Sequence, residues 1–364
     1  MQELDNEYLH SFYRDDRLYG LRLGRPSDAD QMVDLYKNVY GWEYLYPWVY
    51  DPDQFKKALS DKNQYWIVVE PVDTKVILGG GVLKKLNKYT MFAAKLVCKR
   101  EYQGMGFAGI LGTVGVRSLY QQNVFEGIVR LETDIRAKTY NSQKFIETIG
   151  CIPYGYIPNY NNYADKRHFD PSRGEPFIKG KLEPVVMYFR PFNKFWKLRK
   201  NNIYLYDQEH ILKAYNIIKD NNSRKMKSDV LTIKKKSDEF QKQGSLKIRK
   251  DFYKGIVTLR GYMEQNEIKQ ILSEFSDWNI IEWRVPTDIP QSIKYQKLAI
   301  DSGFDVVGYD PCSTHYNTFA DTIIFNYFPN GVAFSQFGDI TLTKKSKPFA
   351  ELVMDSLEEL YSNY

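Results

Sequence analysis

The spacing of hydrophobic and polar residues over positions 20–191 predicts strands and helices in a mixed order. Positions 21–26 alternate between apolar and polar residues, which is typical of a strand with one buried face. Apolar residues at helical spacing follow at 32–36, and Ser27 is placed to cap that helix. Later strands are predicted at 65–70, 75–83, 92–97, 128–135, 152–157 and 184–189, and later helices at 110–120 and 141–149. The order β-α-β-β-β-α-β-α-β-β predicts an α/β (α+β) chain.

The chain also contains an internal repeat. Residues 148–156 align with 301–309, residues 183–187 align with 321–325, and Gln143-Lys144 matches Gln296-Lys297. We name 143–187 the first copy and 296–325 the second copy. Because only two copies are present, the repeat indicates duplication of one βαββ segment rather than a solenoid.

Length, charge and the repeat predict two domains, at residues 1–195 and 196–364. A basic, polar segment at about 224–250 is rich in lysine, so it is a candidate for binding nucleic acid or another anionic surface. Asp229, Asp238 and Glu239 interrupt its positive charge, which favours a solvated face over a nucleic-acid site. The formal net charge of +6 fits binding of a polyphosphate cofactor as readily as binding of a polymer.

The most informative motif is the hexapeptide Gln103–Ala108, which lies between a predicted strand and a predicted helix. Its two glycines, Gly104 and Gly106, allow a tight turn that exposes backbone N–H groups. Because these groups lie at a helix N-terminus, where the dipole also favours negative charge, the turn suits a pyrophosphate. Many strand-to-helix loops need glycine only for turning, so the hexapeptide alone leaves both interpretations open.

Two nucleotide-binding motifs fit the hexapeptide poorly. Residues 104–109 match the dinucleotide pattern Gly-x-Gly-x-x-Gly, but that pattern should open the first βα unit of a fold. Here several predicted elements precede it. A P-loop would end in Gly-Lys-Ser/Thr, and this ending is absent.

The hexapeptide resembles motif A of the GCN5-related N-acetyltransferases (GNAT), Gln/Arg-x-x-Gly-x-Gly/Ala. Gln103, Gly106 and Ala108 occupy the specified positions, and the resemblance extends over roughly residues 20–191. It implies a mixed central sheet of GNAT type flanked by helices, followed by a second, smaller GNAT-like αβ domain. No such motif occurs between 200 and 300, so the second domain is expected to have lost its cofactor loop. Its expected roles are to complete the sheet, shape the acceptor site or form a dimer interface.

The same resemblance implies acetyl-CoA as the cofactor. In that family, loop amides hold the pyrophosphate, and main-chain amides of the preceding strand polarise the acetyl carbonyl. The residues carried over to these roles are Leu96, Val97, Gln103, Gly104, Met105, Gly106, Phe107 and Ala108. The implied reaction is direct transfer of acetyl from acetyl-CoA to a primary amine of a small molecule.

The catalytic acid and base are less clearly marked. The family often has a tyrosine in its last helix that acts as general acid for the departing CoA thiolate. The aligned position here is Ile146, so Tyr156, which is nearby in the sequence, is the candidate acid instead. Glu132 and Asp134 are candidate bases because they share one face of a predicted strand. The alternative is that these carboxylates pair with Arg130 or Arg136 on the same face.

In the family that the motif resembles, the connection after the first helix borders the acceptor pocket, and here this connection is rich in aromatic residues. Residues 40–50 hold six aromatics, of which Trp42, Tyr44, Tyr46 and Trp48 are the expected acceptor-binding residues. Rings of this kind can flank a primary amine. A second aromatic segment lies at 154–177. The alternative is that both segments pack against the second domain.

The sequence as a whole predicts a cytoplasmic two-domain acetyltransferase, and a homodimer is compatible with this prediction. The N-terminus lacks a signal-like apolar stretch, no apolar run is long enough to span a membrane, and Cys98, Cys151 and Cys312 are expected to be reduced. No metal site is expected from the spacing of histidine, cysteine and carboxylate residues. The alternative function is a non-catalytic module that binds acyl-CoA as a sensor or scaffold.

Overall fold

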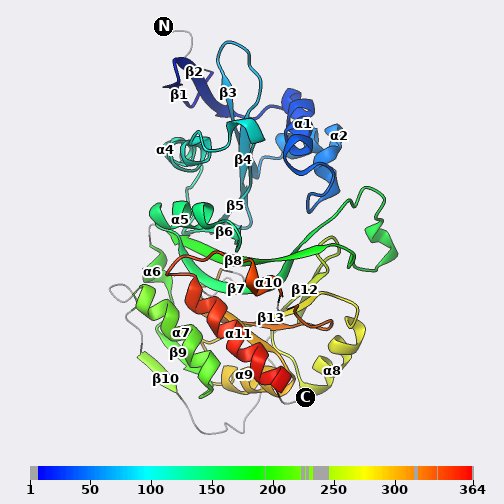
Figure 1. Cartoon of the computed structure of the whole chain (residues 1–364). Helices are drawn as coiled ribbons and strands as arrows, with labels where there is room; N and C mark the ends of the chain where they lie inside the picture. The colour runs from blue at the N-terminus through cyan, green and yellow to red at the C-terminus, as the bar shows by residue number, and fades with distance from the viewer. Residues whose placement is uncertain are drawn as a thin grey trace. The chain divides into compact units, whose positions relative to one another are not determined.

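The computed structural model describes residues 7–192, 194–222, 226, 229–232, 246–314, 319–333 and 335–362 (Figure 1). The chain packs as two compact units, the first containing 1–133 with 164–168 and the second containing 134–163 with 169–364. The domains 1–195 and 196–364, which the repeat defines, stay a prediction. Most of the basic segment at about 224–250 lies outside the described residues.

The first unit is built on strands in the order β1-β2-β3-β4-β5-β6. Neighbours from β1 to β5 pair antiparallel, whereas β5 and β6 pair parallel. The bounds are β1 (His10–Arg14), β2 (Arg17–Leu23), β3 (Gln64–Pro71), β4 (Gly79–Lys85), β5 (Thr90–Cys98) and β6 (Arg130–Arg136), whose last residues belong to the second unit.

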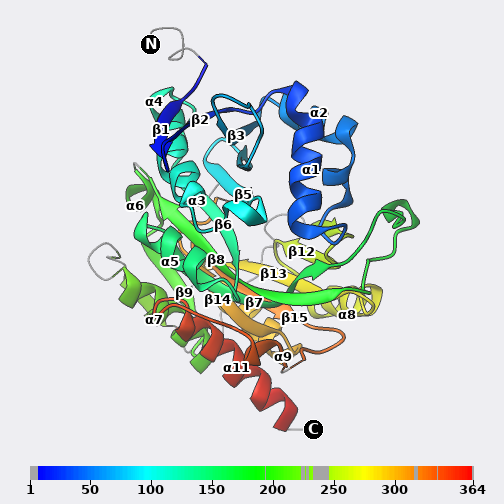
Figure 2. The same ribbon diagram turned by 45° about the horizontal axis from the view of Figure 1, so that its top comes forward.

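Helices cover both faces of this sheet, with α1 and α2 on one side and α3 and α4 on the other (Figure 2). A turn of π-helix over Leu111–Gly115 joins α3 to α4, so the helical run is continuous from Phe107 to Gln121. Gly115 lets this run approach β3, because a Cβ there would lie 2.9 Å from Ile67 Cδ1. The bounds are α1 (Ala29–Tyr40), α2 (Pro52–Ser60), α3 (Phe107–Ile110) and α4 (Val116–Gln121), with short 3-10 turns at Pro26–Asp28, Pro47–Tyr50 and Arg100–Tyr102.

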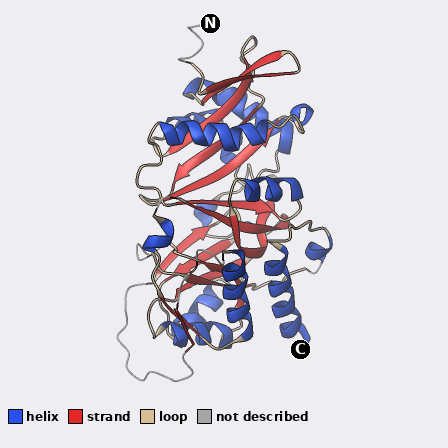
Figure 3. Ribbon diagram, turned by 90° about the vertical axis from the view of Figure 1, so that its left-hand side faces the viewer, coloured by secondary structure: helices blue, strands red, loops and turns tan. Residues whose placement is uncertain are grey.

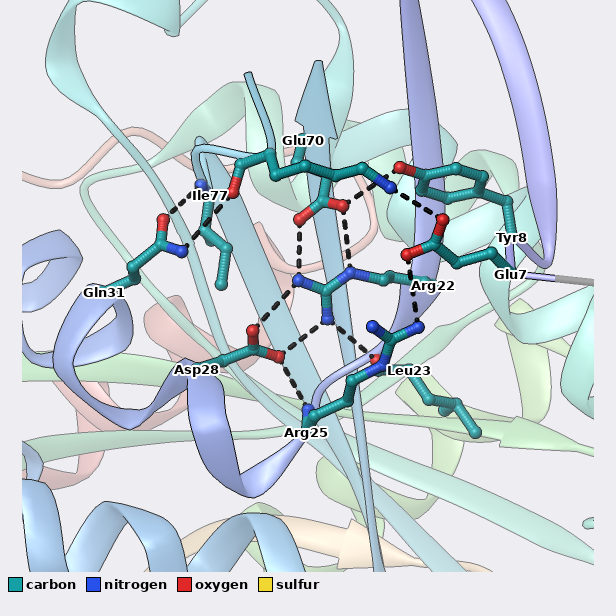
Figure 4. Close-up of polar contacts among 10 residues, drawn as sticks. Glu7, Tyr8, Arg22, Leu23, Arg25, Asp28, Gln31, Glu70 and Ile77 are labelled. Atoms are coloured by element: carbon teal, nitrogen blue, oxygen red, sulfur yellow. Dashed lines mark hydrogen bonds and ion pairs between the residues drawn. The ribbon is translucent and has the colours of Figure 1, made fainter. Parts of the chain in front are cut away.

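A buried ion-pair network joins β2, β3 and the turn before α1 (Figure 4). The Arg22 guanidinium donates to both carboxylate oxygens of Asp28 at 2.7 and 3.0 Å, and to both of Glu70 at 3.0 and 2.6 Å. Tyr8 also donates to Glu70, at 3.1 Å. Burial works against the charge of Arg22, but hydrogen bonds to Asp28 and Glu70 outweigh it and raise the pKa of the guanidinium. The network fixes the entry into α1 relative to the sheet.

The second unit has strands in the order β8-β7-β14-β15-β13-β12-β11, together with the parallel pair β10-β9. Figure 3 shows the mixture of helices and strands in the molecule. The strands are β7 (Ile152–Tyr163), β8 (Lys181–Pro191), β9 (Asn202–Leu205), β10 (Asp229–Thr232), β11 (Lys247–Asp251), β12 (Ile256–Arg260), β13 (Ile280–Pro286), β14 (Asp305–Asp310) and β15 (Thr322–Tyr327). The helices are α5 (Tyr140–Thr148), α6 (Phe195–Leu198), α7 (Glu209–Asn221), α8 (Gln265–Glu274), α9 (Ser292–Asp301), α10 (Ser335–Gly338) and α11 (Lys347–Ser362), with a 3-10 turn at Pro171–Arg173.

Several predicted boundaries shift in the structure. The strand predicted at 75–83 begins only at Gly79, because Lys75 has a φ of 57° and Ile77 donates its N–H to the Gln31 side chain rather than to a strand. The helix predicted at 110–120 begins at Phe107, directly after the left-handed Gly106. The strand predicted at 152–157 extends to Tyr163, because it keeps pairing with β8 after a register shift. The predicted mixed α/β class is confirmed.

The two copies of the repeat meet at two equivalent glycines. Gly155 in β7 and Gly308 in β14 face each other as register partners in an antiparallel pair. The backbones approach so closely that a Cβ on Gly308 would lie 2.5 Å from the Tyr154 carbonyl oxygen. Because the sequence alignment also matches these two positions, the pairing relates the copies by an approximate two-fold axis between them.

The chain segment that follows each copy packs against the other copy. Tyr204, which follows β8 of the first copy, donates its N–H to Thr287 O at 2.8 Å. Its carbonyl accepts from Gln296 Nε2, also at 2.8 Å. Gln296 is a fully buried residue of α9, so the first arm (202–221, ending in α7) is bound to the second copy.

The reciprocal contact has the same form. Thr341, which follows β15 of the second copy, donates its N–H to Ala137 O at 3.0 Å and accepts from Gln143 Nε2 at 3.0 Å. Gln143 is the residue that the repeat aligns with Gln296, and it is equally buried in α5. The second arm (341–362, ending in α11) is therefore bound to the first copy, and the two copies hold each other in place.

Asp305 makes the second unit sensitive to pH. Burial raises the pKa of this carboxyl to about 7, partly opposed by the hydrogen bond that Ser356 of α11 donates to it. Its neutral form is favoured in the folded state, so the stability it contributes at low pH is lost as the pH rises through about 7. We expect Asp305→Asn to be more stable than wild type at pH 8, by on the order of 2–4 kcal/mol, and not at pH 4. Urea unfolding at both pH values tests this, and an equal difference at each would contradict it.

Candidate functional site

Strand β5 contains a bulge in its second half. Gly80 pairs with Val97 and Val82 with Ala94, so one extra residue is inserted on β5 between these pairs. Lys95 carries the distortion, with a φ of 58°. Its carbonyl accepts a hydrogen bond from the Tyr36 hydroxyl at 3.1 Å, which ties the bulge to α1.

The pairing of β5 with β6 covers only the first residues of β5. The parallel register joins Thr90–Phe92 to Arg130–Glu132 and, in the part of the chain described, stops there. Leu96 is 46% exposed, whereas the next residue, Val97, is buried. We call this stretch of β5 main chain, around Leu96 and Val97, the slot, because the described ladder with β6 does not reach it.

The glycine loop begins just after this slot. Gly104 and Gly106 have φ values of +86° and +82°, both in the left-handed region. A Cβ at Gly104 would meet no atom within 4 Å, so the loop faces open space there. Gln103 turns back and donates to the Cys98 carbonyl at 3.2 Å. The predicted tight turn between a strand and a helix therefore exists, and it lies against the end of β5.

Phe107 anchors the loop to the sheet. Its ring is buried and lies 5.0 Å from the ring of Tyr19 and 6.1 Å from that of Phe12. Arg14 of β1 reaches the same place, because its Nη1 would lie 3.9 Å from a Cβ built on Gly106. A guanidinium thus stands beside the amides at the start of the helical run.

Both candidate bases have cationic partners. Arg130 Nε lies 2.8 Å from Glu132 Oε1, and both side chains are buried. Asp134 is less buried and lies 3.7 Å from Lys254 Nζ. For Glu132, the structure contains the Arg130 ion pair that the sequence left as an alternative; Asp134 pairs with a lysine that the sequence did not suggest.

The candidate acid Tyr156 is fully buried in β7, and its ring centroid lies 5.9 Å from that of Phe337. Burial raises the pKa of its phenol above the ordinary value. Ile146, at the position of the family's tyrosine, is buried in α5. The role of Tyr156 stays a prediction.

The aromatic residues of the segment 40–50 differ in burial and in the residues that they contact. Tyr44 is buried, 4.8 Å from the ring of Tyr40 and 5.0 Å from that of Tyr36, so its ring belongs to the core. Trp42 is exposed to solvent and lies under the guanidinium of Arg167, 4.0 Å away.

Tyr46 and Trp48 both contact Lys95. The Lys95 ammonium lies 4.9 Å from the centre of the Tyr46 ring and 5.4 Å from that of Trp48. Trp48 packs on Phe55 and Trp66, with ring centroids at 5.4 and 6.5 Å. Lys95, the residue at the bulge of β5, therefore contacts two of the predicted acceptor residues.

Residues 164–168, from the connection between β7 and β8, belong to the first unit and support this segment. Lys166 is almost fully buried and donates to the Leu45 carbonyl at 3.1 Å. Arg167 is held by Asp165, and this hydrogen bond lowers the pKa of the aspartate to about 2. Sequence reasoning identified the aromatic residues but missed Lys95, Arg14 and Arg167, because a single basic residue carries no positional signal.

Burial raises the pKa of the Cys98 thiol to about 11, so this residue at the end of β5 is protonated at neutral pH. Among the residues that the structure describes, no group of three or more His, Cys, Asp and Glu side chains is arranged to hold a metal ion. In the same part of the chain, no helix combines the length and apolar character that crossing a bilayer requires.

No protein-family model and no curated protein matches the sequence. Solved structures do resemble it. The ribosomal-protein-S5-alanine acetyltransferase from Vibrio fischeri is 16% identical, with a TM-score of 0.38 over 50% of this chain and 96% of that one. An acetyltransferase of the GNAT family from Streptococcus pneumoniae is 15% identical, with a TM-score of 0.36 over 48% and 99% of the two chains.

The spermidine N-acetyltransferase from Vibrio cholerae, solved with CoA and spermine, is 18% identical, with a TM-score of 0.37 over 48% of this chain and 95% of that one. These neighbours are acetyltransferases. The likeness covers about half of this chain and concerns its fold. We therefore argue function from the geometry of β5, its bulge and the loop that follows.

The Arg130–Glu132 pair gives a test that separates a structural from a catalytic role. We expect Glu132→Gln to destabilise the protein by about 3–5 kcal/mol, because Arg130 would keep a buried, uncompensated charge. The double variant Arg130→Met/Glu132→Leu should recover most of this loss. Urea unfolding measures both, and a Glu132→Gln variant as stable as wild type would contradict the structural role.

Proposed function

We propose that this chain binds acetyl-CoA along the second half of β5 and transfers its acetyl group to a primary amine of a small molecule. The observation that carries this proposal is the arrangement of one strand. The end of the described β5–β6 ladder, a bulge and a glycine turn follow one another between Phe92 and Gly106. Together they offer main-chain donors at two places, the slot and the start of a helical run.

The glycine turn fits a pyrophosphate. The N–H groups at the start of the run that begins at Phe107 lack intrahelical acceptors by their position, as at any helix N-terminus. Gly104 and Gly106 leave room for close approach, and Arg14 adds positive charge. These features support the loop residues Gln103–Ala108 as the holders of the CoA phosphates.

The slot fits the acyl end. Acetyl-CoA supplies an activated thioester, whose carbonyl needs hydrogen-bond donors as its oxygen gains charge. We assign this task to main-chain amides near Leu96 and Val97, which lie beyond the end of the described β5–β6 ladder. The attacking amine must lose a proton, and the candidate bases are Glu132 and Asp134, of which Asp134 is the less buried.

The strands β12 and β13 precede the second copy as β5 and β6 precede the first, and they support the proposal by contrast. Strand β12 pairs with β13 along its whole length, Ile256–Arg260 with Ile280–Arg284. The indole of Trp283 also donates to the Gly261 carbonyl at 2.9 Å, where the chain leaves β12. A sheet paired in this way has no slot. We therefore infer that residues 196–364 form a GNAT-like domain without a cofactor site.

A module that binds acyl-CoA without catalysis is the second candidate. It is favoured by Ile146 in place of a tyrosine and by the cationic partners of Glu132 and Asp134. Binding alone cannot separate the two candidates, so binding and turnover need separate tests.

Substitution in the glycine turn tests cofactor binding. We expect Gly106→Asp to reduce acetyl-CoA affinity at least tenfold, because a carboxylate would stand where the phosphates bind. Gly174→Asp is the matched control, since Gly174 has the same φ of 82° and open space around it. Calorimetric titration of acetyl-CoA into both folded variants measures the effect. Equal affinity in the two variants would reject the loop as the phosphate site.

Turnover tests catalysis. We expect wild-type protein with acetyl-CoA and a panel of primary amines to release free CoA thiol faster than the Gly106→Asp variant does. Thiol release measured with a chromogenic disulfide detects the reaction. Tight acetyl-CoA binding with no amine-dependent release would favour the non-catalytic module.

A further inference from the structure

The hairpin formed by β1 and β2 begins before the stretch 20–191 that resembles the acetyltransferase family. Five residue pairs join its strands, and the last of them places Arg14 directly opposite Arg17. The two residues between them, Asp15 and Asp16, have φ values of 47° and 58°. Positive φ at both positions is typical of the shortest hairpin turns, which match the twist of the strands that they join. The backbone position of Arg14 is therefore set by regular pairing and by a short turn.

One face of β1 lies against the residue that follows the glycine turn. Phe12 and Arg14 share this face, because alternate residues of a strand point the same way. The Phe12 ring lies 6.1 Å from that of Phe107 and 5.7 Å from that of Tyr19. On the same face, Nη1 of Arg14 is 3.9 Å from the position of a Cβ built on Gly106. The hairpin therefore holds a guanidinium at the glycine turn.

The hairpin is fixed to the rest of the first unit at both ends. Near its turn, Arg17 donates to both carboxylate oxygens of Asp73, at 3.0 and 3.1 Å. At the other end, the Tyr8 ring packs so closely on β2 that a Cβ on Gly20 would lie 2.2 Å from it. These contacts position the strand that carries Arg14 before any ligand binds.

Arg14 has a charge that the described part of the chain does not neutralise. Side chains directly opposite each other in an antiparallel pair lie close together, so two arginines at such positions repel each other. Asp73 neutralises Arg17, whereas Arg14 is exposed and, among the described residues, has no hydrogen-bond or ion-pair partner. An anion bound at the glycine turn would supply the missing countercharge.

We propose that Arg14 binds the pyrophosphate of the cofactor together with the glycine turn, and that the β1–β2 hairpin thereby selects thioesters of CoA over thioesters of pantetheine. This inference rests on the proposed function. A guanidinium presents paired N–H donors whose geometry matches phosphate oxygens. The acetylpantetheine part of acetyl-CoA is uncharged and offers no such partner. The contribution of Arg14 to binding therefore depends on the phosphates, although the reacting thioester is the same in both compounds.

Substitution of Arg14 tests the assignment. We expect Arg14→Gln to bind acetyl-CoA about tenfold more weakly than wild type, because a charge-assisted hydrogen bond is lost. Arg117→Gln is the matched control, since Arg117 is another exposed arginine, in α4 of the same helical run and roughly 15 Å beyond its start. Calorimetric titration measures each affinity. Equal affinity of wild type and Arg14→Gln overturns the role of Arg14 alone, whereas a wild type that does not bind acetyl-CoA refutes the proposed function and this inference with it.

Cofactor analogues identify the group that Arg14 binds. 3′-Dephospho-acetyl-CoA keeps the pyrophosphate, so we expect Arg14→Gln to lose about tenfold in affinity for it as well. S-acetylpantetheine has no phosphate, and we expect it to bind wild type and Arg14→Gln equally, in both cases more weakly than acetyl-CoA binds wild type. A loss that disappears with the 3′-dephospho analogue overturns the assignment to the pyrophosphate. An equal loss with S-acetylpantetheine also overturns it, because the effect would then not depend on phosphate.

Discussion

Strand β5 cannot pair with both neighbours along its whole length, and the candidate site depends on this constraint. The extra residue at Lys95 twists the strand away from a regular ladder with β4, and the parallel pairing with β6 ends at Phe92. A sheet normally satisfies its main-chain groups internally, so the proposed site places its main-chain donors beyond the end of this ladder. The strands β12 and β13, which precede the second copy as β5 and β6 precede the first, pair along the whole of β12.

The rest of the first unit holds that interrupted strand in place. Arg22, Asp28 and Glu70 fix the start of α1, and Tyr36 of α1 in turn binds the Lys95 carbonyl. On the other face, Phe107 and Gly115 let the helical run pack closely on β1–β3. Rigid support matters here because hydrogen-bond donors must be aimed before a substrate arrives.

Sequence and structure differ most where pairing, rather than local pattern, decides the outcome. The glycine turn was predictable, because Gly104 and Gly106 adopt backbone angles that few other residues tolerate. The bulge was not, because Lys95 is an ordinary residue whose conformation is imposed by the strands beside it. The repeat was visible in the sequence, yet the exchanged arms were not. Buried glutamines such as Gln143 and Gln296 look like any surface glutamine until their partners are known. The assignment of the base stays a prediction for a related reason. A carboxylate close to an arginine in the sequence is compatible both with a general base and with one half of an ion pair.

The reciprocal exchange of the two arms has a consequence for how such a molecule can diverge. In a symmetric dimer of identical chains, every mutation appears twice, so neither subunit can give up a working site alone. Here Gln143 and Gln296 hold each other's arms within a single polypeptide, and each copy varies independently. One copy can change its surface without a matching change in the other, as long as its buried glutamine still holds the other copy's arm. Covalent linkage thus allows two structurally related copies to take different roles.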